Sequence, residues 1–324
     1  MLSRQLARTG EAISAIGFGC VGLLRAEAQE EPESIATLLQ AIDRGMTHLD
    51  TAASYQEGRN ERFVGAAIKG RRDRVFVATK CGYTTDPDGR VRADNRPATI
   101  LGSCDASLGR LGVERIDLFY LHRIDKSVPL EDSIGTLGEL VHAGKVRYLG
   151  LSECSAQTLR QAYALHPVAA MQSEYSLWSR DIEDSVLPAC RELGVSLVAY
   201  SPLGRGFLAG KYRSSSDVAP NDRNRPCFQD EAFEHNLTLL DAVREFAARK
   251  HCTPAQLALA WVLAQGEDIL PITGMKTRAH LEDNLGALNV RLTVAEANAL
   301  RDRITALGPR GERHAAGNLA AMER

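Results

Sequence analysis

The sequence has no long hydrophobic run, since none of its apolar stretches approaches the ~18 residues that a membrane-spanning helix needs. Its first residues, MLSRQLARTGEAIS, contain no apolar core of the kind that a secretory signal carries. Nor does one charge dominate, because 39 Lys and Arg stand against 41 Asp and Glu, a formal net charge of −2. We therefore expect a cytoplasmic protein with no membrane contact and no basic face for nucleic acid.

Cysteine and histidine motifs are also missing. The seven cysteines are dispersed and form no C-x-x-C pair, which predicts buried thiols in a reducing compartment and not a disulfide framework. The eight histidines form neither an H-x-H nor an H-E-x-x-H pair. We therefore expect no bound metal, and a metal-dependent hydrolase has little support.

What the sequence does have is a regular alternation of short apolar runs and longer amphipathic stretches, in a chain of 324 residues that is 44% hydrophobic. The apolar runs have the pattern of buried parallel strands. They cover residues 16–20, 48–50, 75–80, 116–122, 146–152, 169–173, 196–200 and 269–273. The stretches between and after them predict helices over residues 33–44, 60–69, 97–111, 130–143, 155–165, 182–193, 233–251, 254–265 and 278–287.

Strands and helices that alternate in one uninterrupted series favour a closed (β/α)8 TIM barrel. A doubly wound open sheet is the competing α/β arrangement. No linker or low-complexity segment divides the chain, so we expect residues 1–324 to form a single domain.

Three segments lie outside the repeating pattern. Residues 3–14 contain Thr9-Gly10 between short alternating runs and predict a hairpin that caps the barrel floor. Residues 292–304 predict an extra helix near the end of the chain. The stretch 201–230, which follows the seventh strand, is rich in Gly, Pro, Ser, Arg and Asn. Barrels often bind phosphate at that place, so we interpret it as a functional loop and not a disordered one.

One glycine motif is misleading. Gly17-Phe18-Gly19-Cys20-Val21-Gly22 matches G-x-G-x-x-G after the first strand, the fingerprint of a Rossmann dinucleotide site. In that fold the motif opens a helix whose N-terminus holds the pyrophosphate, whereas here the next convincing helix starts only after Pro32. We interpret the motif as a glycine-rich strand end at the mouth of a barrel.

The predicted strand ends carry four residues suited to one reaction. Asp50, Lys80 and His122 end their strands, and Tyr55 follows in the loop after Asp50. Barrel enzymes place catalytic groups at such ends. A carbonyl that accepts hydride must also receive a proton, and tyrosine is a poor acid near neutrality unless its phenolate is stabilised. A lysine held by an aspartate can do this, and a histidine can orient the carbonyl oxygen.

Each of the four residues also has a structural interpretation. Asp50 could cap a helix, Tyr55 could be a rim aromatic, Lys80 could reach solvent and His122 could be a satisfied core histidine. All four together on one face of a barrel favour the catalytic interpretation.

Seven segments resemble the aldo-keto reductase superfamily in order and spacing: HLDTAASYQEGRNERFVGAAI, VFVATKCG, IDLFYLHRID, VRYLGLSE, MQSEYSLWSR, LVAYSPLGRGFLAG and PITGMKTRAHLEDNLGAL. The resemblance extends to about Asn289. Within the superfamily, EYSLWSR and YSPLGRGFLAG are similar to the microbial and plant branch that includes pyridoxal and general aldehyde reductases. The resemblance implies NADPH-dependent reduction of aldehydes or ketones to alcohols.

The resemblance also implies a role for each matching position. Tyr55 matches the general acid, Lys80 and Asp50 the partners that lower its pKa, and His122 the group that orients the carbonyl. At the nicotinamide, the matching positions are Ser152 and Gln172 for the carboxamide and Tyr200 for stacking on the ring. The positions that match the pyrophosphate loop are Ser201, Pro202, Leu203, Gly204, Arg205 and Gly206, and those that match the 2′-phosphate site are Lys276, Thr277 and Arg278. Asp283 and Asn284 match positions near the adenine, and the further contacts are Gly19, Cys20, Asp50 and Gly274.

Taken alone, Lys276 and Arg278 could bind the 2′-phosphate or could be two solvated charges at a helix start. Together with the family resemblance they favour NADPH over NADH. Lys276 and Arg278 flank a predicted helix N-terminus, whose free N–H groups and dipole attract an anion.

Three positions depart from the family pattern. Thr273 stands where proline is common, Met275 replaces a small polar residue, and Glu153 follows Ser152 where other branches have asparagine.

The substrate pocket and the assembly are less determined. Residues that could line the mouth are Tyr55, Trp178, Phe228, Tyr83 and Arg123, and an aromatic wall would favour aromatic or apolar aldehydes. Two rival functions stay open: a Schiff-base aldolase that uses Lys80, and a non-enzymatic NADPH-sensing regulatory subunit on the same scaffold. The sequence predicts neither the physiological substrate nor the oligomeric state.

Overall fold

Eight parallel strands close into a barrel in the computed structural model, which describes residues 1–24, 31–85 and 91–314. The strands are β3 (Gly17–Gly19), β4 (His48–Asp50), β5 (Phe76–Cys81), β8 (Ile116–Leu121), β9 (Val146–Ser152), β10 (Val168–Glu174), β11 (Ser196–Tyr200) and β12 (Ile269–Thr273). The barrel closes where Ile272 of β12 pairs with Gly17 of β3. The predicted (β/α)8 barrel is confirmed, and the open-sheet alternative is wrong.

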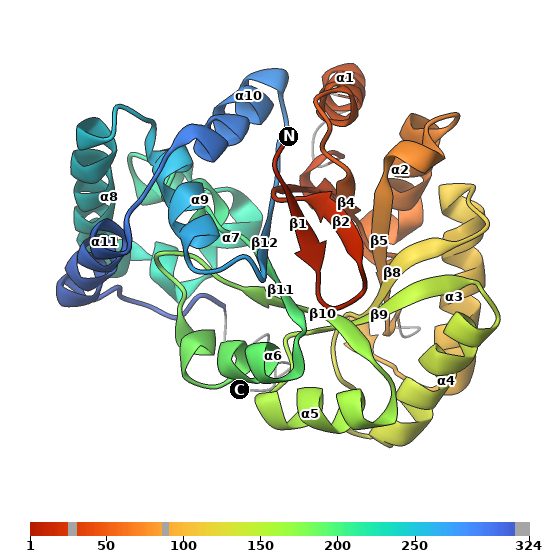
Figure 1. Ribbon diagram of the computed structural model, residues 1–324. Helices are drawn as coiled ribbons and strands as arrows, with labels where there is room; N and C mark the ends of the chain where they lie inside the picture. Colours follow the sequence, from red (N-terminus) through yellow and green to blue (C-terminus); the bar gives the residue numbers. More distant parts are fainter. Residues whose placement is uncertain (25–30, 86–90, 315–324) are drawn as a thin grey trace.

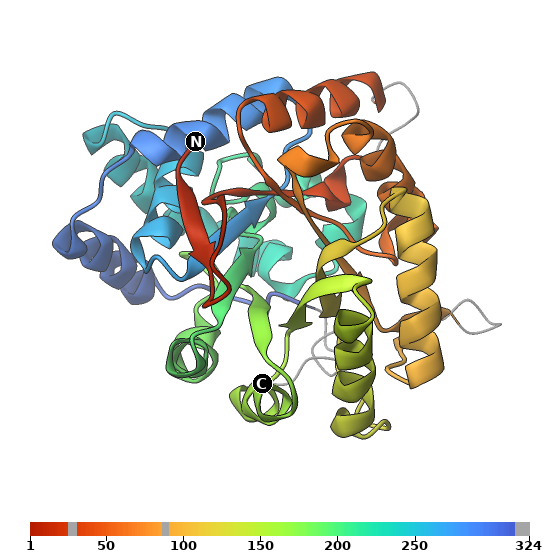
Figure 2. The same cartoon turned by 45° about the vertical axis from the view of Figure 1, so that its right-hand side comes forward.

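Helices surround this barrel (Figure 1), and the turned view shows the same ring (Figure 2). They are α1 (Glu31–Asp43), α2 (Arg59–Ile68), α3 (Pro97–Leu111), α4 (Leu130–His142), α5 (Ala156–Leu165), α6 (Val186–Leu193), α8 (Asp230–Arg249), α9 (Pro254–Ala264), α10 (Arg278–Gly286) and α11 (Val294–Leu307). Ser155 and Thr253 cap α5 and α9 by accepting hydrogen bonds from backbone N–H groups, as their positions before these helices predict.

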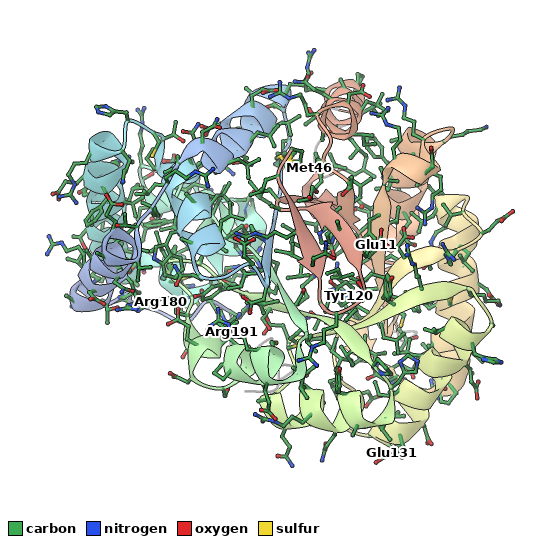
Figure 3. All side chains as sticks on the ribbon, in the orientation of Figure 1. Glu11, Met46, Tyr120, Glu131, Arg180 and Arg191 are labelled. Carbon is green, nitrogen blue, oxygen red and sulfur yellow. The ribbon has the colours of Figure 1, made fainter. Side chains whose placement is uncertain are left out.

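The apolar residues pack into two clusters. The larger cluster lies between the strands and the helices, and the smaller one contains residues such as Leu118, Tyr120 and Val198. Tyr120 lies within the ring of strands, whereas Glu131 projects outward from α4 (Figure 3). Glycine is required at position 150, because a Cβ there would overlap the Tyr120 ring. All seven cysteines are free thiols, and only Cys252 is not buried.

A hairpin covers one end of the barrel, as predicted. It consists of β1 (Ser3–Leu6) and β2 (Glu11–Ser14), which pair antiparallel around Thr9-Gly10. Its Leu6 and Ile13 side chains are buried and join the smaller apolar cluster, so the hairpin extends the core of the barrel. The extra helix is also present, as α11. Within the described parts of the chain, none of the helices is long and apolar enough to cross a membrane.

Three local features of the structure were not predicted. The helix predicted over 182–193 is divided into a 3-10 turn, Asp181–Asp184, and α6, because Pro188 has no N–H to bond back to the preceding turn. A second hairpin, β6 (Tyr83–Thr85) with β7 (Val91–Ala93), was not predicted. The long loop 201–230 is not wholly irregular, since it contains α7 (Pro220–Arg223) and short 3-10 turns.

Candidate active site

A buried ion pair lies at the carboxyl ends of two neighbouring strands. Lys80 of β5 donates a hydrogen bond from Nζ to Asp50 Oδ1 of β4 at 2.5 Å, and a second one to the backbone oxygen of Thr51 at 2.8 Å. The Lys80 and Asp50 side chains are almost completely buried, at 0% and 3% exposure. Gln172 of β10 donates to the other oxygen, Asp50 Oδ2, at 2.8 Å. The barrel therefore buries a lysine ammonium against the Asp50 carboxylate, and both oxygens of that carboxylate accept hydrogen bonds.

Two aromatic rings border this ion pair. Tyr55 begins the 3-10 helix η3 (Tyr55–Gly58), and its ring centroid lies 5.2 Å from Lys80 Nζ. The His122 ring, directly after β8, lies edge-on to the Tyr55 ring with centroids 5.9 Å apart. The Tyr83 ring also contacts the His122 ring edge-on, with ring centroids 4.9 Å apart. The structure thus brings together all four predicted catalytic residues, Asp50, Tyr55, Lys80 and His122.

The surroundings shift the pKa of three of these groups, Tyr55, Lys80 and His122. Burial raises the pKa of Tyr55, while the Lys80 ammonium acts in the opposite direction and only partly offsets it; Asp50 adds to the rise. Lys80 thus acts on this pKa in the direction that its implied role requires, whereas the direct effect of Asp50 is the opposite, and Asp50 acts by holding Lys80. Burial alone would lower the pKa of Lys80, but Asp50 and Tyr55 raise it above its ordinary value. Burial, Lys80 and Arg123 together hold the pKa of His122 well below its ordinary value, so this imidazole is neutral at pH 7.

The loop that carries Tyr55 is strained and firmly anchored. Gln56 and Glu57 adopt left-handed backbone angles, with φ of 45° and 54°. Each such angle costs a non-glycine residue about 1 kcal/mol or more. Buried hydrogen bonds hold the loop, because Asn60 accepts from Thr51 Oγ1 at 2.7 Å and donates to the backbone oxygen of Cys20 at 2.9 Å. The loop position of Tyr55 therefore depends on residues on both sides of it.

The predicted cofactor residues that follow β9 and β11 surround the same mouth. Ser152 is buried and accepts a hydrogen bond from Arg123 at 3.3 Å. Tyr200 ends β11, and its buried hydroxyl has no hydrogen-bond partner among the described residues. The segment Ser201–Gly206 then turns tightly, with positive φ at Ser201, Gly204, Arg205 and Gly206, and with Pro202 buried and Leu203 half-buried.

The N-terminus of α10 already holds a carboxylate. Thr277 caps this helix by accepting from the His280 N–H, and Arg278 follows as its first residue. Glu33 of α1 accepts hydrogen bonds from the backbone N of Arg278 at 3.1 Å and from its guanidinium at 3.0 and 3.2 Å. Lys276 lies near Gly22, where an added Cβ would be 3.9 Å from the Lys276 Cε. The start of α10 therefore binds a carboxylate through Arg278, and Lys276 precedes it by two residues.

The other predicted cofactor residues have different surroundings. Gly19 lies beside Thr273 and Gly274 at the joint between β3 and β12, and Cys20 is buried next to Asp50. Asp283 accepts hydrogen bonds from Thr253 and Gln256 at the start of α9. Asn284 is buried and contacts Thr273 Oγ1 at 3.4 Å. Asp283 and Asn284 therefore make contacts that support α9 and β12.

The residues expected to line the mouth divide into two groups. Tyr83 and Arg123 are half-buried beside His122. Trp178 packs on Phe207 with ring centroids 4.5 Å apart, and Phe228 is only 2% exposed within the same aromatic cluster. Phe228 thus packs in the interior of the long loop, while Tyr83 and Arg123 lie with the ion pair.

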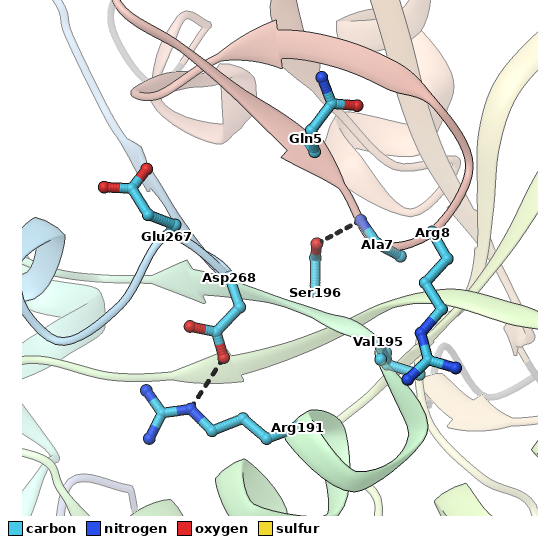
Figure 4. A pocket seen from close by; sticks show the side chains of 9 residues that line it. Gln5, Ala7, Arg8, Arg191, Val195, Ser196, Glu267 and Asp268 are labelled. Carbon is cyan, nitrogen blue, oxygen red and sulfur yellow. Dashed lines mark hydrogen bonds and ion pairs between the residues drawn. The ribbon is translucent and has the colours of Figure 1, made fainter.

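A separate cleft of about 380 Å³ lies at the other end of the barrel (Figure 4). The hairpin lines it through Gln5, Ala7 and Arg8, and the segments that lead into β11 and β12 complete it. Some of its polar groups pair with one another, since Ala7 N donates to Ser196 Oγ and Arg191 donates to Asp268. Because barrel enzymes use the carboxyl ends of their strands, we interpret this cleft as the seam below the hairpin.

Sequence reasoning missed a group of charges beside Tyr200. Arg313 and His314, which follow α11, reach Glu153 and Glu174 at the ends of β9 and β10. No pattern in the sequence connects residues 139 to 160 positions apart, so only the folded chain brings them together. Among the described residues, no group of three or more His, Cys, Asp or Glu side chains could hold a metal ion.

A closed parallel barrel with a buried ion pair, a tyrosine and a histidine at its carboxyl end is the arrangement of a barrel enzyme. The chain belongs to the aldo/keto reductase family, whose sequence pattern matches residues 15–304. It is 45% identical over 302 residues to aldo-keto reductase yakc [NADP(+)] of Schizosaccharomyces pombe, a match that covers 90% of this chain and 88% of that protein.

Solved structures give the same result. The glycerol dehydrogenase AKR11B4 from Gluconobacter oxydans superposes with a TM-score of 0.87 at 28% identity, covering 95% of this chain and 96% of that one. The holo form of the aldo-keto reductase AKR11C1 from Bacillus halodurans superposes with a TM-score of 0.78 at 26% identity, covering 94% and 96%. The predicted family resemblance is confirmed.

Proposed function

We propose that this protein reduces aldehydes and ketones to alcohols with NADPH, and that Tyr55 gives the proton. The observation that carries the proposal is the buried Lys80–Asp50 ion pair directly beside the Tyr55 ring. The name of the Schizosaccharomyces pombe relative states NADP(+), which supports the cofactor.

The donors at the start of α10 fit the 2′-phosphate of NADPH. They already hold the Glu33 carboxylate, so their chemistry suits an anion, and the phosphate would displace Glu33. Lys276 and Thr277 would complete this site, Ser201–Gly206 would face the pyrophosphate, and Ser152 and Tyr200 would face the nicotinamide. When bound, NADPH supplies the hydride for the carbonyl carbon.

The chain's own residues manage the proton. The neutral His122 imidazole can donate a hydrogen bond to the carbonyl oxygen and hold it near Tyr55. Tyr55, whose pKa is raised, keeps its proton until negative charge develops on that oxygen, then transfers it. Lys80 stabilises the phenolate that remains, and solvent returns the proton. Asp50 and Gln172 keep Lys80 charged and in place.

The aldolase alternative loses support. A Schiff base needs a neutral amine, whereas Asp50 holds the Lys80 ammonium buried and raises its pKa.

The rings of Tyr83 and Tyr55, which lie beside His122, favour an apolar or aromatic carbonyl compound as substrate.

The direct test is consumption of NADPH in the presence of a carbonyl panel that includes a nitrobenzaldehyde. The absorbance of the reduced nicotinamide should fall with added aldehyde and stay constant without it. Constant absorbance across a broad panel, together with tight NADPH binding, would reject the reductase and favour the NADPH-sensing alternative.

The 2′-phosphate site makes a paired prediction. Arg278→Ala should weaken NADPH binding roughly tenfold or more, because a charge-assisted contact is lost, while NADH binding should change little. Glu33→Gln should tighten NADPH about two- to fivefold, because an exposed ion pair no longer competes for the site.

Dissociation constants for both cofactors, measured by titration, check this pair. A change of equal size for NADPH and NADH in either variant would contradict the assignment of the phosphate to Arg278.

A further inference from the structure

The segment after α11 is bound firmly to α8 and to the long loop. Arg310 N donates to Asn236 Oδ1 at 2.9 Å, and Asn236 Nδ2 donates to the Arg310 oxygen at 2.9 Å. Cys227 N donates to the Glu312 oxygen at 3.2 Å. Gly311 has a φ of +80°, and a Cβ there would lie 2.5 Å from Cys227 N. Backbone contacts and a required glycine therefore deliver the next residues to one defined place.

That place is a cluster of three carboxylates, of which two, Glu153 and Glu174, are buried. The Arg313 guanidinium lies 3.2 Å from Glu153, 3.6 Å from Glu174 and 3.1 Å from Asp181. The Glu153 and Glu174 side chains are 4% and 6% exposed, and Arg313 is 11% exposed. Glu153 also adopts a left-handed backbone angle and accepts a hydrogen bond from the Glu174 N–H. Two buried carboxylates this close need a cation, because leaving them uncompensated is costly.

The same cluster faces the proposed nicotinamide site. Glu153 directly follows Ser152, and Glu174 pairs in register with Tyr200 across the sheet. Burial raises the pKa of Tyr200 well above its ordinary value, Glu153 and Glu174 raise it further, and Arg123 and Arg313 act in the opposite direction. All four charges therefore act on the ring against which the nicotinamide would stack.

We propose that Arg313 is a positioning residue of the cofactor site, which holds Glu153 and Glu174, offsets their charge, and so shifts the binding preference of the site from oxidised towards reduced nicotinamide. The inference rests on the proposed function, because it takes Tyr200 as the nicotinamide platform. The oxidised ring carries a positive charge and the reduced ring is neutral, so nearby carboxylates favour NADP⁺. A guanidinium between them weakens that preference and suits the site to NADPH.

The test compares dissociation constants for NADPH and NADP⁺, from quenching of tryptophan fluorescence, in the full chain. Arg313→Met should raise the ratio of the NADPH constant to the NADP⁺ constant about tenfold, from the loss of one charge in a partly buried site. Glu153→Gln should lower the same ratio by a few-fold. Arg313→Lys should keep the ratio near that of the wild type.

Two further variants separate the effect of the Arg313 charge from that of anchoring the segment after α11. Arg310→Met changes the same residue type in the same segment, but its side chain is exposed, so the ratio should not move. The double variant Glu153→Gln, Arg313→Met should return the ratio towards the wild-type value. If Arg313→Met does not fold, Glu153→Gln still tests the sign.

Equal weakening of both cofactors by Arg313→Met, or an unchanged ratio in Glu153→Gln, would overturn the proposal and leave Arg313 as an anchor of the tail. Failure of the wild-type protein to bind either nucleotide would instead reject the proposed function.

Discussion

Tyr55→Phe should lower kcat for aldehyde reduction by about 10²- to 10⁴-fold, the range expected when a general acid is removed. The ring stays, so its edge-on contact with His122 and its packing beside Lys80 should persist. NADPH affinity should be nearly unchanged, because the proton is needed only when charge develops on the carbonyl oxygen. Steady-state kinetics and cofactor titration measure the two quantities separately.

The comparison variant for this prediction is Tyr83→Phe. Tyr83 also contacts His122, but the Lys80 ammonium lies over the ring of Tyr55. The loss of activity in Tyr83→Phe should therefore be at least an order of magnitude smaller than that of Tyr55→Phe. A Tyr55→Phe protein that keeps most of its kcat would show that another group supplies the proton.

Lys80→Met should lose both activity and stability. The variant leaves Asp50 buried without its cation, and removal of one partner from a buried ion pair typically costs about 3–5 kcal/mol of unfolding free energy. The phenolate of Tyr55 would also lose the charge that stabilises it, so kcat should fall by roughly 10²-fold or more. Denaturant unfolding and steady-state kinetics measure the two losses.

The double variant Asp50→Asn, Lys80→Met separates these effects. It removes both buried charges, so most of the unfolding free energy should return, while activity should stay low. Near wild-type activity in the double variant would mean that the ion pair only supports the fold, and the role proposed for Lys80 would be wrong.

The strands could be predicted because each carries its own local signal. Residues 48–50, 146–152, 196–200 and 269–273 were predicted with the bounds that the structure has. These runs are short, mostly buried and bounded by loop-type residues, as parallel strands in a barrel require, so neighbouring context changes little. The hairpin of β6 and β7 was missed because its strands are largely exposed and so carry no apolar run. The sequence Asp86-Pro87-Asp88-Gly89, which is typical of turns, was the signal that could have indicated it.

The candidate site was predictable where its residues end strands. Asp50 and Lys80 are neighbours because β4 and β5 pair, and the order of the strands along the chain implies that pairing. Contacts between distant segments could not be predicted in the same way. Glu33 contacts the start of α10, and Asp283 contacts the start of α9. Both contacts depend on how the helices pack, which short-range sequence patterns do not encode.

The sequence by itself determined the barrel, its capping hairpin and the four residues Asp50, Tyr55, Lys80 and His122, because periodicity and strand ends are local properties. Tertiary structure alone decided which charges these residues meet. Gln172 turns to Asp50, and Arg313 crosses from the end of the chain to Glu153. Burial also decides the pKa of Tyr55 and His122, because the cost of desolvation depends on the whole fold around a group and not on its neighbours in sequence.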